Sequence, residues 1–221
     1  MGTESGIFMR RNYFVIIGDI IQSRGLRDRQ NVQESFKAAL KSAQRTYGQS
    51  IVSPLTLTIG DEFQAVLRDA QNFFAIINHL KENLPAIGFR YGLGVGEIRT
   101  ALNRSAAIGM DGPAFYFARQ ALEQARQEGR RFVFVCDTPK VQARIDLLLH
   151  WIDAVTASWS KEKEQILRLS QLRLTQKAIA AKIGISQPAV SQHMRQPVFR
   201  LVVQSQWVVR DEINDLLGSA R

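Results

Sequence analysis

The chain has 221 residues, of which 45% are apolar and 22% charged, a balance typical of one large or two modest globular domains. This composition excludes disordered, collagen-like and coiled-coil proteins, and the absence of a long apolar stretch or a signal peptide predicts a cytoplasmic protein without membrane contact. The net charge of +9 favours polyanionic partners, and residues 158–221 carry +5 of it, with 10 Lys and Arg against 5 Asp and Glu.

The apolar pattern of the first 157 residues predicts a mixed α+β domain. The expected elements are, in chain order, a strand at 13–17, a helix at 28–46, a hairpin of strands at 51–59 and 63–67, a helix at 69–83 and a strand at 89–95. This βαββαβ order is typical of a ferredoxin-like sheet. A helix at 113–127, a strand at 132–136 and a helix at 140–157 extend it. We expect the domain boundary near Ser158.

Residues 158–221 predict a small all-α domain that contains a helix-turn-helix at 176–195. Gly184 suits the turn between the two helices, Ser186 can cap the second helix, and Pro188 falls in its first turn, where a missing N–H is harmless. The apolar face of residues 198–217 belongs either to a closing helix of this domain or to a dimer contact.

A helix-turn-helix predicts double-stranded DNA as a partner, because its second helix can enter the major groove. Glutamine can bond adenine at two positions and arginine can bond guanine, whereas lysine on the first helix would contact phosphate. The expected DNA-binding residues are Lys177, Ser186, Gln187, Pro188, Ser191, Gln192 and Arg195. The alternative is a unit that packs against another protein or only builds a helical bundle.

Two acidic positions predict a metal site in the first domain. Asp19 ends the first strand, and Asp61 with Glu62 occupies the turn before the third strand. In a βαββαβ sheet the third strand lies antiparallel beside the first, so Asp19 and Asp61 would be neighbours. Oxygen ligands at a sheet edge suit Mg²⁺ or Mn²⁺, which could bind a triphosphate. Alternatively, Asp19 caps a turn and Gly60–Asp61 is an ordinary hairpin pair.

Four segments, in this order and spacing, resemble the catalytic palm of class III nucleotidyl cyclases and GGDEF diguanylate cyclases over residues 12–136. The segments are Ile17-Gly18-Asp19-Ile20-Ile21, Thr58-Ile59-Gly60-Asp61-Glu62-Phe63, Arg90-Tyr91-Gly92-Leu93-Gly94-Val95-Gly96 and Gly112-Pro113-Ala114-Phe115 through Arg119. With the helix-turn-helix attached, the whole chain is similar to the bacterial SatD-like family.

The palm resemblance implies roles for individual residues. Asp19 and Asp61 match the metal-binding aspartates, the carbonyl of Ile20 would complete that site, and Gly60 matches the hairpin glycine. Arg119 matches an arginine that steadies the transition state across a homodimer. Glu62 joins Arg119 as a candidate catalytic residue, and Asp111 is a candidate for contact with the nucleotide base.

The chain also departs from the palm pattern, and its function stays open between three hypotheses. Phe115 replaces the asparagine expected before the arginine, and Leu57 replaces the lysine that selects the purine. We therefore expect a DNA-binding regulator whose palm binds a nucleoside triphosphate or other nucleotide with a divalent metal. The alternative is an active cyclase or nucleotidyltransferase that uses the helix-turn-helix for localisation or dimerisation. A third hypothesis makes the palm only a dimerisation scaffold.

Overall fold

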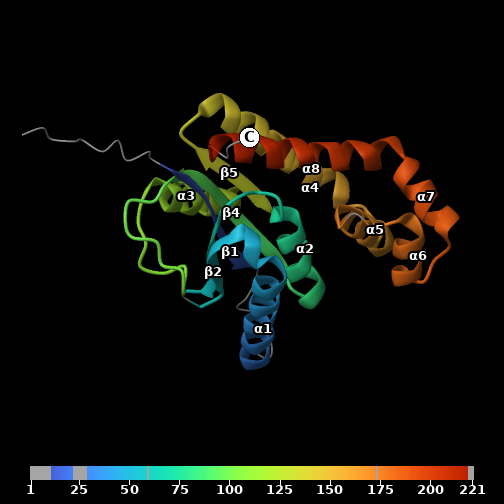
Figure 1. The fold of residues 1–221 in the computed structure, drawn as a ribbon, viewed down its shortest axis with the longest axis horizontal. Helices are drawn as coiled ribbons and strands as arrows, with labels where there is room; N and C mark the ends of the chain where they lie inside the picture. Colours follow the sequence, from blue (N-terminus) through green and yellow to red (C-terminus); the bar gives the residue numbers. More distant parts are fainter. Residues whose placement is uncertain (1–10, 22–28, 59, 173, 219–221) are drawn as a thin grey trace, which may run out of the picture.

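A computed structural model of the chain describes residues 11–21, 29–58, 60–172 and 174–218 (Figure 1). The strands are β1 (Asn12–Ile20), β2 (Ile51–Leu57), β3 (Glu62–Leu67), β4 (Phe89–Glu97) and β5 (Phe132–Cys136). The helices are α1 (Arg29–Tyr47), η2 (Gly48–Ser50), α2 (Phe73–Asn83), α3 (Pro113–Glu128), α4 (Pro139–Thr156), α5 (Lys161–Gln171), α6 (Gln176–Ile183), α7 (Gln187–Arg195) and α8 (Pro197–Leu216). Among the described residues, no helix is both long and apolar enough to cross a membrane.

The five strands form one sheet in the order β2-β3-β1-β4-β5. β1 lies at the centre and pairs antiparallel with β3 and β4, while β5 pairs parallel with β4. The predicted βαββαβ order and the α+β class are therefore confirmed for the first 136 residues. The register places Asp19 of β1 opposite Glu62 on one side and Arg90 on the other.

The two faces of the sheet are covered differently. Phe14 and Ile16 of β1 belong to a large core that also receives α1, α2 and α4, whereas Val15 and Ile17 pack against α3. This split follows from the alternation of side chains along a strand. Asp19 has the same parity as Val15 and Ile17, so its carboxylate lies on the face that α3 covers.

Glycines fix the position of α3 on the sheet. A Cβ atom on Gly94 would lie 2.4 Å from both the Ala114 carbonyl oxygen and the Ala118 amide nitrogen, and one on Gly92 would lie 2.2 Å from the Ala118 carbonyl oxygen. Only glycine permits this approach of a helix backbone to a strand. The axis of α3 therefore runs directly over β4, and its residues past Leu122 reach the end of β1.

The C-terminal helices are connected to the sheet by α8. Figure 1 shows α8 running from α7 back to the sheet, alongside α4. The Asn12 Nδ2 atom donates to the Leu216 carbonyl at 2.9 Å, and the Asn214 side chain accepts from the Ala70 amide at 2.8 Å. Buried residues of α8, such as Phe199 and Val202, belong to the same core as the sheet. Residues from both sides of Ser158 thus share one core, and the domain boundary there stays a prediction.

Candidate functional site

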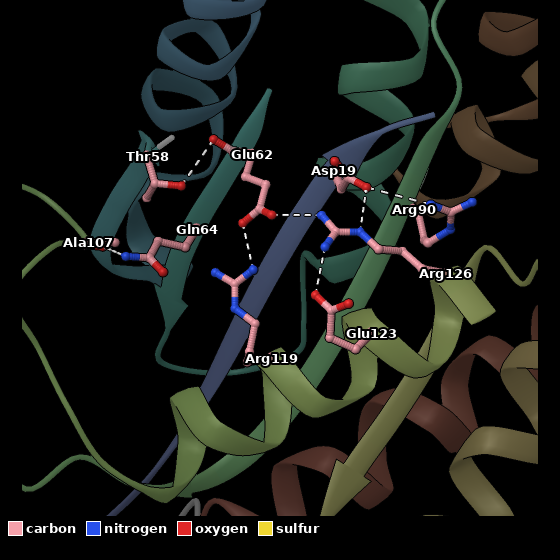
Figure 2. Close-up of polar contacts among 9 residues, drawn as sticks. All are labelled: Asp19, Thr58, Glu62, Gln64, Arg90, Ala107, Arg119, Glu123 and Arg126. Atoms are coloured by element: carbon pink, nitrogen blue, oxygen red, sulfur yellow. Dashed lines mark hydrogen bonds and ion pairs between the residues drawn. The ribbon is translucent and has the colours of Figure 1, made fainter. Parts of the chain in front are cut away.

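The end of β1 carries a cluster of charged residues. We call Asp19, Glu62, Arg90, Arg119 and Arg126 the sheet-end cluster (Figure 2). Antiparallel pairing brings Asp19 beside Glu62, and the Ile20 amide donates to the Asp61 carbonyl at 3.3 Å. The predicted proximity of the two acidic segments is therefore present in the structure.

Helix α3 supplies two of the arginines. The Arg126 guanidinium lies between the acidic residues, with Nε 3.1 Å from Asp19 Oδ2 and NH2 2.7 Å from Glu62 Oε1. Its NH1 atom also bonds Glu123 at 2.6 Å. Arg119 NH1 bonds the second oxygen of Glu62 at 2.7 Å. From the opposite side, the NH1 atom of Arg90 approaches Asp19 Oδ2 at 3.6 Å.

Burial sets the electrostatics of this cluster. Asp19 is 6% exposed, and burial raises the pKa of its carboxyl above the ordinary value, while Arg126 offsets part of that rise. The neighbouring charges of Asp61 and Glu62 act in the same direction as burial. Burial alone would lower the pKa of Arg126, but its bonds to Asp19 and Glu62 raise the pKa overall. Arg126 is therefore a permanently charged partner of both carboxylates.

Guanidinium groups occupy part of the predicted Mg²⁺ or Mn²⁺ site. A divalent ion needs several oxygen ligands, and Asp19 Oδ2 and both carboxylate oxygens of Glu62 bond guanidinium groups here. No group of three or more His, Cys, Asp or Glu side chains among the described residues could hold a metal. The positive charge that these carboxylates require is thus supplied by Arg126, and the metal-ligand roles of Asp19, Ile20 and Asp61 remain predictions.

Gly60, Arg119 and Asp111, the remaining residues that the palm resemblance singles out, lie in three different places in the structure. Gly60 adopts a φ of +70° in the turn between β2 and β3, as a hairpin glycine would. Arg119 pairs with Glu62 of its own chain. Asp111 lies away from the sheet-end cluster. Its backbone carbonyl accepts from the Arg99 amide just past the end of β4 that pairs with Asn12, and Asn12 is about 24 Å from Asp19 at the strand rise of ~3.4 Å per residue. There its carboxylate accepts a hydrogen bond from the Tyr116 hydroxyl at 2.6 Å.

The second candidate site is formed by α6 and α7. Thr175 caps α6 by accepting from the Ala178 amide, and Ser186 caps α7 by accepting from the Ala189 amide. Gly184 ends α6 in the left-handed conformation at φ +80°, which turns the chain sharply into α7. Buried apolar side chains join the two helices to α5 and α8, namely Ile166, Ile179, Ala180, Val190 and Phe199.

The N-terminal part of α7 faces away from this core. Gln187, Pro188, Gln192 and Arg195 are exposed, whereas Ser191 is half-buried. The side-chain Nε2 atom of Gln187 donates to Gln176 Oε1 at 3.0 Å, so α6 orients the first side chain of α7. Lys177 and Lys182 of α6 are exposed as well, and neither they nor Arg195 form an ion pair with any residue that the structure describes. The predicted DNA-binding residues therefore share one accessible region, except that Ser186 also serves as the cap.

Sequence reasoning missed Arg126 and Arg90. Arg119, Glu123 and Arg126 are spaced by four and three residues, the period of one helix face, and this spacing was the available signal. Arg90 directly faces Asp19 in the sheet, which required the register between β1 and β4.

Comparison with known proteins gives one family and a set of distant structures. A model of the SatD family matches residues 13–213. A search of the curated proteins found no match. The guanylyl cyclase domain of the RhoGC fusion protein from the aquatic fungus Blastocladiella emersonii is 16% identical, with a TM-score of 0.41 over 52% of this chain and 75% of that chain. A bacterial light-regulated adenylyl cyclase is also 16% identical, with a TM-score of 0.42 over 56% of this chain and 75% of that chain.

Proposed function

The chain belongs to the SatD family, and we propose that it is a double-stranded DNA-binding regulator in which α6 and α7 act as a helix-turn-helix. The observation that carries this proposal is the capped, exposed start of α7 beside cations that form no ion pair with any described residue. Each helix has a Ser or Thr cap, so the unit presents a fixed geometry. In the proposed complex, α7 enters the major groove and α6 lies across the backbone.

Each side chain has an expected role in that complex. Gln187, Gln192 and Arg195 would contact base edges, because their donors and acceptors can pair with adenine or guanine. Lys177 and Lys182 would contact phosphates and so position the protein without selecting a sequence. Residues 158–221 form the DNA-binding part in this proposal and residues 1–157 the sheet domain, with α8 joining them through its bonds to Asn12 and Ala70.

The test is a selection from randomised duplexes followed by fluorescence anisotropy at several salt concentrations. Arg195→Ala should weaken binding to the selected site by about 1–3 kcal/mol and relax sequence preference. Lys177→Ala should weaken binding to all duplexes alike and lower the salt slope by about one. Lys140→Ala removes an equally exposed lysine from α4 and should change neither quantity. Wild-type protein that retains no duplex at low salt would overturn the proposal.

We further propose that the chain binds DNA as a homodimer. Leu201 and Val208 lie seven residues apart on α8, hence on one face, and they are 50% and 46% exposed. Two copies joined there would present two α7 helices, as palindromic DNA sites require. Light scattering should give twice the chain mass, and Val208→Glu should halve it, whereas Lys140→Glu on the exposed surface of α4 should leave it unchanged. A monomeric wild type would refute the dimer.

A second candidate function is nucleotide binding, with or without turnover, at the sheet-end cluster. The supporting observation is the convergence of Asp19, Asp61 and Arg119 at one edge of a βαββαβ sheet. Incubation with each nucleoside triphosphate and Mn²⁺ should then release pyrophosphate, and Asp61→Asn should abolish the release. Absence of pyrophosphate from every triphosphate, together with absence of binding by calorimetry, would leave DNA binding as the function of the chain.

A further inference from the structure

A cavity lies between the sheet domain and the C-terminal helices. It has a volume of about 440 Å³ and is lined by α2, β5, α4, α5 and α8. Cavities of roughly 300–1,000 Å³ at such junctions are typical of sites for small molecules. None of its lining residues belongs to the sheet-end cluster or to α7. The cavity is therefore a separate feature of the molecule.

Its lining combines an apolar base with polar groups. The apolar side chains come from both parts of the chain and include Phe74, Ile77, Phe132, Ile152 and Leu167. Phe74 is half-buried and offers an aromatic surface against which a planar ring could pack, whereas the Phe132 ring stacks on Tyr91 and is covered by Arg131. This part of the lining favours an apolar, planar ligand body.

The charged residues of the cavity leave a positive excess. Lys81 pairs with Glu164 at 2.8 Å, and Arg168 pairs with Glu82. Two further cations line the same space. Arg131 lies 4.7 Å from the Phe132 ring centroid and reaches Asp153 at 3.6 Å, and Lys161 forms no ion pair with a described residue. Arg131 is thus engaged by Asp153 and the Phe132 ring, and Lys161 is the cation that can meet one small anionic group.

A buried amide completes the polar lining. Gln206 of α8 is 6% exposed and lines the cavity, and its side-chain oxygen accepts a hydrogen bond from Gln171.

We propose that this cavity binds a small organic anion that consists of a planar ring and a single carboxylate or phosphate group. The ring packs against the apolar side chains of Phe74, Ile77 and Leu167, and the anionic group meets Lys161. A triphosphate is disfavoured, because two of the cations are already neutralised by Glu82 and Glu164. The ligand contacts α2 and β5 on one side and α5 on the other, and α5 packs against α6 and α7. Occupancy therefore fixes the position of the α6–α7 unit relative to the sheet, a consequence that rests on the proposed DNA binding.

The binding test uses the fluorescent probe 8-anilinonaphthalene-1-sulfonate, which combines aromatic rings with one anionic group. Wild-type protein should bind it saturably, and Lys161→Glu should weaken the affinity by about tenfold or more, the effect of losing a charge-assisted bond. Lys140→Glu makes the same charge change at an exposed position of α4 outside the cavity and should leave the affinity unchanged. Both lysines are exposed, so neither variant disturbs the core. Equal weakening by both variants, or no saturable binding by the wild type, would overturn the proposal.

Competition identifies the anionic group, and DNA titration tests the coupling separately. Displacement of the probe by salicylate or by adenosine monophosphate assigns a carboxylate or a phosphate, and displacement by neither refutes the site. A saturating competitor should then shift the affinity for duplex DNA in the wild type but not in Lys161→Glu. If the protein binds no DNA, the probe measurements still decide whether the cavity is a ligand site, so the two proposals fail independently. Unchanged DNA affinity with an occupied cavity would refute the coupling alone.

Discussion

Replacement of Arg126 by methionine isolates the electrostatic role of this side chain. Methionine keeps most of the apolar stem but leaves Asp19 and Glu62 without their shared partner. Breaking a buried ion pair by removing one partner costs about 3–5 kcal/mol. The Arg126 side chain is 32% exposed, and Arg90 and Arg119 remain near the carboxylates. We therefore expect a smaller loss of unfolding free energy, about 2 kcal/mol.

The loss of unfolding free energy in Arg126→Met should depend on pH in a defined direction. Burial already raises the native pKa of Asp19, and removal of Arg126 removes the group that lowers it. A carboxyl with a raised native pKa binds its proton more tightly in the folded state than in the unfolded state. The destabilisation caused by its ionised form is therefore absent at low pH and grows as pH rises through the native pKa. The difference in unfolding free energy between wild type and Arg126→Met should therefore be largest near pH 7 and shrink toward pH 4.

Urea unfolding followed by tryptophan fluorescence at pH 7.5 and pH 4.5 measures this difference. Arg119→Met is the matched control, because Arg119 is 44% exposed and pairs with Glu62 alone, so it should cost at most about 1 kcal/mol. Asp19→Asn added to Arg126→Met should recover part of the lost stability, since the uncompensated charge disappears. An Arg126→Met protein as stable as wild type at pH 7.5, or a loss that does not change with pH, would refute this account of the cluster.

Three further predictions concern other parts of the chain. Gly94→Ala should destabilise the protein by about 3 kcal/mol or more in thermal unfolding, because its Cβ would meet the backbone of α3, whereas Gly48→Ala should be nearly neutral. Ser186→Ala should cost about 1 kcal/mol through loss of the α7 cap, measured by the same unfolding, while Ser186→Thr should retain most of the stability. The Cys136 thiol is buried and its pKa is raised, so a thiol reagent at pH 8 should label it only on unfolding; rapid labelling of native protein would contradict its burial.

Much of the fold could be predicted from local sequence patterns, because the sheet contains long apolar runs separated by glycine turns. The strand at 132–136 has the predicted bounds, and the others differ by a few residues at their ends. Helix α5 was not predicted. Its signal lies in Ser160, which caps the helix, followed by Glu162 and Glu164 in the first turn. This helix packs between α2 and the α6–α7 unit. Which of its side chains are buried therefore depends on these neighbours more than on a simple apolar period.

The candidate site could be predicted only in part. The order of the elements predicts which strands pair, but it does not predict where a helix lies on the sheet. The proximity of Asp19 to the acidic turn follows from the antiparallel pairing of β1 and β3. The position of Arg126 depends on how α3 lies on β4, which is set by backbone contacts at Gly92 and Gly94. Asp111 lies at the end of β1 opposite Asp19, because the long connection after β4 precedes it, and its predicted contact with a nucleotide stays a prediction.

The distribution of ion pairs distinguishes the two candidate functions physically. In the sheet-end cluster, the carboxylates of Asp19 and Glu62 neutralise guanidinium groups that could otherwise attract an anionic substrate. On α6 and α7, by contrast, Lys177, Lys182 and Arg195 have no carboxylate partner within the described residues, so their field extends into solvent. An incoming polyanion therefore gains more from the α6–α7 unit than from the sheet end, since only there does it meet cations whose charge is not already compensated.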